Sequence, residues 1–130
     1  MTFFPVTSLY AGLLGLLLLA LSLRVSLVRR ATSTFFGAGE DIRLQRAIRA
    51  QGNFIEYAPM SLILLALLES SGTVPGLLYL LGGMTAGGRL LHALGLSPPR
   101  ERLILRQMGM LLSWTAIGVA SGLLVYAQLG

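Results

Sequence analysis

The sequence predicts an all-α fold, an integral membrane four-helix bundle. Charged residues make up only 12% of its 130 residues and hydrophobic residues 55%, whereas a soluble domain carries about 25% charged residues. Residues 1–23, 70–88 and 107–130 contain no charge, and residues 50–68 contain only Glu56. Each stretch approaches or exceeds the roughly 18 to 20 apolar residues that a helix needs to cross a bilayer. We therefore expect residues 1–130 to form one transmembrane domain.

The expected helices cover about residues 8–28, 41–69, 76–94 and 101–128. Pro5 precedes the first helix, where its missing N–H costs nothing. Glu40 and Asp41 suit the positive dipole end of the second helix. Turn-forming residues separate the later helices: Ser70, Ser71, Gly72 and Pro75 before the third, and Gly95, Pro98 and Pro99 after it.

The basic residues fix an expected orientation, because short loops rich in arginine stay in the cytoplasm. All ten are arginines, in two clusters. Between the first and second apolar stretches lie Arg24, Arg29, Arg30, Arg43, Arg46 and Arg49, and between the third and fourth lie Arg89, Arg100, Arg102 and Arg106. Both termini should therefore face outward and both clusters inward. This placement also argues against nucleic acid as a partner, since the arginines lie at membrane ends with little aromatic interleaving.

Small residues four positions apart let membrane helices approach closely. The pairs Gly83 with Gly87 and Gly118 with Gly122 have this spacing, so we expect them at helix–helix contacts. Cysteine is absent and there is one histidine, which excludes a protein cysteine nucleophile and predicts no metal site. Any thiol chemistry must use the thiol of a ligand.

The second helix carries the most informative polar residues. Its side chains Arg46, Arg49, Asn53 and Glu56 are spaced by three, four and three, which places them on one helix face. A charge as deep as Glu56 needs a partner, and Arg49, two turns earlier, is expected to reach the same pocket only with help from Asn53 or a ligand. One interpretation is polar contact between helices. The other is a site for a zwitterion, since arginine suits carboxylates and glutamate suits an ammonium group.

Residues 49–59, R-A-Q-G-N-F-I-E-Y-A-P, closely resemble the R-A-Q-x-N-x-x-E-Y-x-P signature of the MAPEG family, the membrane-associated proteins in eicosanoid and glutathione metabolism. The resemblance implies a homotrimer of four-helix subunits that binds glutathione between neighbours, near the cytoplasmic face. For a bacterial-type member it implies the inner membrane, with periplasmic termini and cytoplasmic arginine-rich loops.

The resemblance also implies site residues. Glutathione would be bound by Arg30, Arg49, Gln51, Asn53, Glu56, Tyr57 and His92. Arg29 is an alternative to Arg30, because the two resemble a basic pair of the family. His92 follows Arg89 as a tyrosine or histidine follows an arginine in the family, but Leu96 stands where the eicosanoid enzymes have a tyrosine.

Arg106 resembles the arginine at the start of the fourth helix to which several family enzymes assign thiol activation, with Arg100 and Arg102 as alternatives. A cation near a thiol favours the nucleophilic thiolate. The resemblance thus implies a glutathione transferase that attacks a lipophilic electrophile arriving from the membrane lipids, or related isomerase or peroxidase chemistry. Two alternatives stay open: a non-catalytic member that binds lipid or scaffolds partners, and a small multidrug exporter that uses Glu56.

Overall fold

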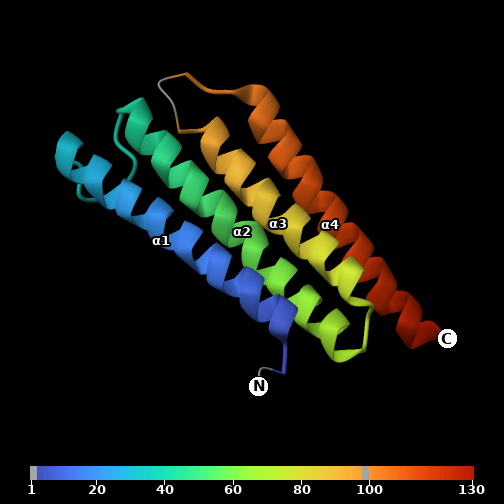
Figure 1. The fold of residues 1–130 in the computed structure, drawn as a ribbon. Coiled ribbons are helices and arrows are strands. Elements are labelled where there is room, and N and C mark those ends of the chain that lie inside the picture. The colour runs from blue at the N-terminus through green and yellow to red at the C-terminus, as the bar shows by residue number, and fades with distance from the viewer. Residues whose placement is uncertain (1–2, 98–99) are drawn as a thin grey trace.

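The computed structural model describes residues 3–97 and 100–130. It contains four helices: α1 (Pro5–Thr32), α2 (Ile42–Ser70), α3 (Pro75–Gly95) and α4 (Leu103–Leu129). They lie antiparallel and side by side in one elongated bundle, with α1 and α4 at its edges (Figure 1). No strand occurs within the described ranges. The all-helical prediction is confirmed, while the expected break at Pro98 and Pro99 lies outside the described residues.

The helix ends differ from expectation by a few residues, for local reasons. α1 continues to Thr32, and Arg29 and Arg30 in its last turn complement the negative end of its dipole. Asp41 caps α2, because its carboxylate accepts a hydrogen bond from the Arg43 N–H at 2.8 Å and pairs with the Arg43 guanidinium. These hydrogen bonds lower the pKa of Asp41 to about 2.

The packing is closest between α3 and α4. A Cβ placed on Gly109 of α4 would lie 2.5 Å from the Gly88 carbonyl oxygen and 2.7 Å from the His92 nitrogen of α3, and one on Gly95 would lie 2.7 Å from Arg106 Cγ. Both positions therefore require glycine. α2 packs on the other three helices, whereas α1 makes no contact with α4 in the described chain.

Of the glycines that we expected at helix contacts, Gly83 contacts another helix in the described part of the chain. A Cβ on Gly83 would lie 3.6 Å from the Tyr10 hydroxyl of α1, whereas one on Gly87, Gly118 or Gly122 would meet no other described atom within 4 Å. Spacing alone does not say which helix face turns inward, and a role for these three glycines between copies of the chain stays a prediction.

Two apolar clusters form the core. One, nearer the termini, comprises Val6, Leu65, Leu68, Leu78, Leu81, Ala116 and Ala120. The other joins the first three helices and comprises Leu14, Leu21, Ala50, Phe54, Ala58, Ala93 and Leu96. The core also contains buried polar side chains, among them Asn53, Arg89, His92 and Ser113. The buried polar residues are the first sign of a site.

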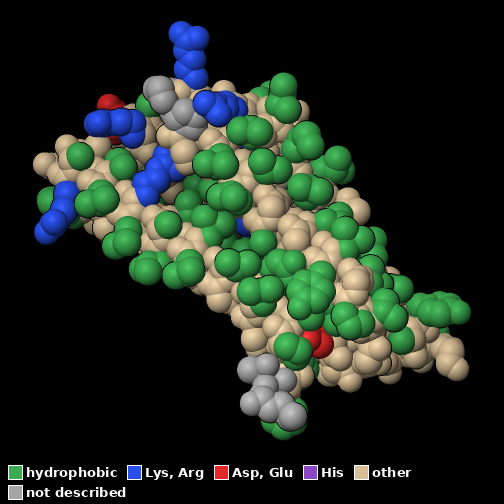
Figure 2. Space-filling view, in the orientation of Figure 1, with side chains coloured by type: hydrophobic (Ala, Val, Ile, Leu, Met, Phe, Trp, Pro, Cys, Tyr) green, Lys and Arg blue, Asp and Glu red, His purple; other side chains and the backbone are tan. Residues whose placement is uncertain are grey.

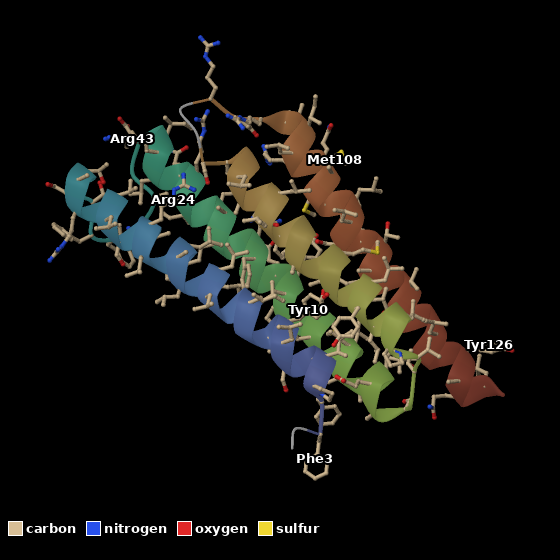
Figure 3. The ribbon with its side chains drawn as sticks, viewed as in Figure 1. Phe3, Tyr10, Arg24, Arg43, Met108 and Tyr126 are labelled. Carbon is tan, nitrogen blue, oxygen red and sulfur yellow. The ribbon has the colours of Figure 1, made fainter. Side chains whose placement is uncertain are left out.

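The outside of the bundle suits a bilayer. By length and composition α1, α2 and α4 could each cross a membrane. α3 has 21 residues, enough for about 30 Å, but it is not among these three helices, so its crossing stays a prediction. Apolar side chains cover the visible face, and arginines gather at one end (Figure 2). Arg24 and Arg43 lie at this end, opposite Phe3 and Tyr126 (Figure 3).

Candidate functional site

Arg49 and Glu56 form an ion pair on the outer side of α2. Arg49 Nη1 lies 3.0 Å from Glu56 Oε1, and Nη2 lies 3.3 Å from Oε2, so both nitrogens of the fork are engaged. The expectation that Arg49 needs help to reach Glu56 was wrong, because the two long side chains together span the two turns between them. The pairing occurs within one helix rather than between helices. With side chains 55% and 49% exposed, the pair is accessible.

Asn53 lies on the same helix between these residues, but its side chain points into the bundle and is 3% exposed. Its Oδ1 accepts a hydrogen bond from Arg89 Nη1, and its Nδ2 lies 3.5 Å from Met110 Sδ. The expected stripe is therefore divided. The ion pair faces outward, and Asn53 fastens α2 to α3 and α4 behind it.

Arg89 of α3 is the centre of the buried network and is only 1% exposed. Its Nε and Nη2 donate to Ser113 Oγ at 3.0 and 2.7 Å, and Nη2 also donates to the Gly109 carbonyl oxygen at 3.2 Å. Within residues 3–97 and 100–130 no carboxylate pairs with it. A buried charge of this kind is expensive unless it is hydrogen bonded. Neutral oxygen atoms on α2 and α4 supply that compensation.

Tyr57 joins the buried network to the surface. The Arg89 guanidinium carbon lies 4.9 Å from the centre of the Tyr57 ring, a cation–π geometry. The Tyr57 hydroxyl accepts a hydrogen bond from Trp114 Nε1 at 3.2 Å. Arg89 of α3 thus fixes the position of the Tyr57 ring, and Trp114 of α4 fixes that of its hydroxyl.

An open groove follows α4 from its first turn to Trp114. Its volume is about 440 Å³, and it is lined by Leu103, Arg106, Gln107, Met110, Leu111 and Trp114. We call it the α4 groove. Met110 connects it to the network, because its sulfur contacts both Asn53 and Arg89. The α4 groove is therefore a mainly apolar surface groove with one cation near its arginine-rich end.

That cation, Arg106, forms an ion pair with Glu101, while its buried Nε has no hydrogen-bond partner. Its backbone and Cγ rest on Gly95 of α3, which places the side chain in the groove. The alternative Arg102 lies just before α4, and its N–H donates to the Gly95 carbonyl oxygen at 2.9 Å. Arg100 lies farther along the same connection.

His92 is 3% exposed and packs against Gly109 at the α3–α4 contact. The structure therefore places His92 inside the contact between α3 and α4.

The remaining predicted residues point elsewhere within this chain. Gln51 Nε2 donates to Ser22 Oγ of α1 at 2.8 Å. Arg30 is exposed at the end of α1, and its neighbour Arg29 donates to loop carbonyl oxygens. Leu96 is buried in the apolar cluster of the first three helices. None of these side chains is brought to the α4 groove by its own chain.

Sequence reasoning placed Arg89 in the second arginine cluster and used it to recognise His92. The structure instead buries Arg89 inside the bundle on α3. Sequence reasoning also overlooked Ser113, Met110 and Trp114. One signal for Arg89 was available, since a charge inside an otherwise apolar helix is by default a functional candidate. Its partners gave no such signal. A serine, a methionine and a tryptophan are ordinary in a membrane helix, and only the packing of α3 on α4 selects them.

These features define a helical integral membrane protein with a polar network and an exposed ion pair beside an open groove. The chain belongs to the MAPEG family, whose sequence model matches residues 7–126. It is similar to the inner membrane protein YecN of Escherichia coli K12, at 34% identity over 86% of this chain and 84% of that protein. YecN of the E. coli strain CFT073 matches with the same identity and coverage. No solved structure matches the chain.

Proposed function

We propose that this chain is a glutathione-dependent transferase of the bacterial inner membrane, with periplasmic termini and cytoplasmic arginine-rich loops. The observation that carries the proposal is the exposed Arg49–Glu56 pair, together with a groove that contains a third charged group, Arg106, and is linked to α2 by the Tyr57–Trp114 hydrogen bond. Membership of a family named for glutathione metabolism supports the choice of ligand.

Glutathione would bind by exchange of charged partners. It carries two carboxylates and an ammonium group, so one carboxylate can take the place of Glu56 on Arg49 while the ammonium takes the place of Arg49 on Glu56. The exchange leaves neither Arg49 nor Glu56 unpaired, and exposed ion pairs are weak enough to be exchanged. Tyr57, held by Arg89 and Trp114, would form a wall of this site, with Asn53 and His92 supporting it from inside.

Arg106 would stabilise the thiolate. The thiol loses its proton to solvent, and the sulfur then forms a carbon–sulfur bond with an electrophile whose leaving group departs with the bonding electrons. The guanidinium stabilises the anionic sulfur before attack, which is electrostatic catalysis. The α4 groove is lined by apolar side chains, so a lipophilic electrophile can enter it from the bilayer.

A homotrimer would complete the site. Arg30 extends from the end of α1, and α1 makes no contact with α4 among the described residues. A role for Arg30 or Arg29 beside the α4 groove therefore requires a neighbouring copy of the chain. Gln51 would act indirectly, by fixing α2 against α1 through Ser22.

Calorimetry with glutathione tests the binding step on the purified protein. We expect Arg49→Ala and Glu56→Ala each to weaken binding at least tenfold, because loss of a charge-assisted hydrogen bond costs about 1.5–3 kcal/mol. Arg43→Ala is the matched control, since Arg43 is also an exposed, ion-paired arginine of α2. Dissociation of the oligomer by either variant, with binding retained, would show that the pair serves assembly instead.

Conjugation of glutathione to 1-chloro-2,4-dinitrobenzene tests the chemistry. Arg106→Ala should lower kcat while leaving glutathione affinity nearly unchanged. It should also raise the pKa of the thiol of bound glutathione, which the pH–rate profile measures. Glu101→Gln should keep the activity, because it releases Arg106 from its ion pair.

Tight glutathione binding without turnover would favour the non-catalytic alternative. The pairing of Arg106 with Glu101 supports this alternative. The exporter alternative is disfavoured because Arg49 already neutralises Glu56.

A further inference from the structure

A second groove lies on the other side of the bundle, between α1 and α3. Its volume is about 280 Å³, and its lining is wholly apolar: Leu13, Leu14, Leu17, Ala86, Gly87 and Leu90. We call it the α1–α3 groove. Gly87 keeps it open, because a Cβ there would meet no atom within 4 Å. Neither the ion pair of α2 nor Arg106 contributes to this groove.

One end of the groove leads to a cation. Arg24 follows Leu17 by seven residues in α1, so it lies on the groove side of that helix and about 10 Å farther along. Ser97 follows the end of α3 and lies beside Arg24. Arg24 Nη1 donates to Ser97 Oγ and Nη2 to the Leu96 carbonyl oxygen, each at 3.1 Å. These contacts hold the guanidinium above the groove and use two of its five N–H donors.

Arg24 has no carboxylate partner in the described chain. Four of the five acidic residues are already engaged: Asp41 with Arg43, Glu56 with Arg49, Glu101 with Arg106, and Glu69 with the first turn of α1. The nearby charge of Arg46 repels that of Arg24. Surplus positive charge is therefore held in place at the end of an apolar groove.

The opposite end of the α1–α3 groove is closed. The Tyr10 ring of α1 packs directly on Gly82 of α3, where an added Cβ would overlap it, and its hydroxyl donates to the Tyr79 carbonyl oxygen at 2.9 Å. A ligand can thus extend from the arginine-rich end toward Tyr10 but not past it. The occupant should have an anionic head and an apolar chain that ends before Tyr10.

We propose that the α1–α3 groove binds one anionic phospholipid, with its phosphate on Arg24 and Ser97 and an acyl chain along Leu17, Gly87 and Leu90. The charge complementarity of Arg24, the apolar lining and the single closed end together select this ligand. Arginine binds phosphate through paired N–H donors, and basic pockets between membrane helices suit anionic lipid headgroups. The site is separate from the proposed glutathione site.

The test uses the purified protein in detergent, with bound lipid counted by native mass spectrometry. The probes are dioleoylphosphatidylglycerol, dioleoylphosphatidylcholine and inorganic phosphate. We expect one phosphatidylglycerol per chain, bound at least about fivefold more tightly than phosphatidylcholine, the factor that one arginine contributes near a lipid surface. Inorganic phosphate should not compete, because it lacks the acyl chain.

Paired variants separate the head and the chain of the lipid. Arg24→Gln removes the charge but keeps a donor for Leu96 and Ser97, and it should abolish the preference for phosphatidylglycerol, whereas Arg43→Gln should not. Gly87→Leu should fill the groove and weaken both lipids, whereas Gly118→Leu, at an equally open position of α4, should not. If Arg24→Gln fails to fold, the comparison of Gly87→Leu with Gly118→Leu still tests the proposal.

Three results would overturn the proposal. The first is equal affinity for the two lipids. The second is an equal loss in Arg24→Gln and Arg43→Gln, which would mean general attraction to a positive surface. The third is dissociation of the oligomer by Gly87→Leu with lipid binding intact, which would identify the α1–α3 groove as a contact between copies of the chain.

Discussion

Arg89 shows how a single residue can hold the bundle together. Its guanidinium donates hydrogen bonds to oxygen atoms of α2 and α4 and lies over the Tyr57 ring, so three helices meet at one side chain. The charge is compensated by neutral groups alone within the described residues. Arg89 is therefore a positioning residue: it stands behind the proposed glutathione site and sets where Asn53 and Tyr57 lie.

Replacing Arg89 by leucine should destabilise the protein by about 2–4 kcal/mol, because Ser113, the Asn53 side chain and the Gly109 carbonyl lose their buried partner. Thermal unfolding in detergent micelles, followed by circular dichroism, measures this. Arg43→Leu removes the same charge from an exposed site and should change stability by less than about 0.5 kcal/mol. Equal unfolding midpoints for both variants would contradict the central role of Arg89.

Residue-level prediction succeeded where spacing along one helix carries the information. Arg49 and Glu56 were expected on one face of a helix, and the structure pairs them there. The prediction failed for Asn53. This residue has the same helical spacing as Arg49 and Glu56, but its side chain points into the bundle. A shift of one residue along a helix is enough to move a side chain from the lipid side to the interior. Ser113 and Met110 could not be found at all, since their importance comes from a partner on another helix.

At the scale of elements, the contact between α3 and α4 governs the site. Gly88, Gly95 and Gly109 let the two backbones approach so closely that His92 and Arg106 share one small region. The sequence contains 16 glycines, and nothing in their local pattern separates these three from the rest. The helices themselves follow from apolar stretches and caps, which are local, whereas the choice of contacting glycines depends on three-dimensional packing.

Adding one methyl group at Gly109 should push α3 and α4 apart, because the new Cβ would lie 2.5 Å from the Gly88 carbonyl oxygen. We expect Gly109→Ala to cost about 1–3 kcal/mol, the usual range for overpacking. The matched control is Gly118→Ala on the same helix, where the methyl group meets open space and helix propensity improves. Unfolding in detergent measures both, and equal stability would mean that the bundle tolerates a wider α3–α4 spacing.

At the scale of the whole molecule, the distribution of charge and the arrangement of the helices agree. Both ends of the chain lie at one end of the bundle, and the arginine-rich connections lie at the other (Figures 1 and 2). An even number of crossings produces this arrangement. If α3 did not cross the membrane, the two ends of the chain would lie on opposite sides, so the topology tests whether α3 crosses.

Fusions to alkaline phosphatase, which folds only in the periplasm, provide this test. We expect activity from fusions after Gly72, in the turn between α2 and α3, and after Gly130, and none from a fusion after Gly39 in the connection between α1 and α2. A reporter that folds only in the cytoplasm should give the reverse pattern. Activity after Gly72 but not after Gly130 would mean that α3 does not span the bilayer.

The network around Arg89 also has a consequence for the order of synthesis. When α3 leaves the ribosome, Asn53 has already emerged, but Ser113 and Gly109, which accept three of the Arg89 hydrogen bonds, are still inside it. Until they emerge, α3 carries the charge of Arg89 without these partners. Its stable insertion should therefore wait for α4, so that the second half of the chain enters the membrane as a hairpin rather than one helix at a time.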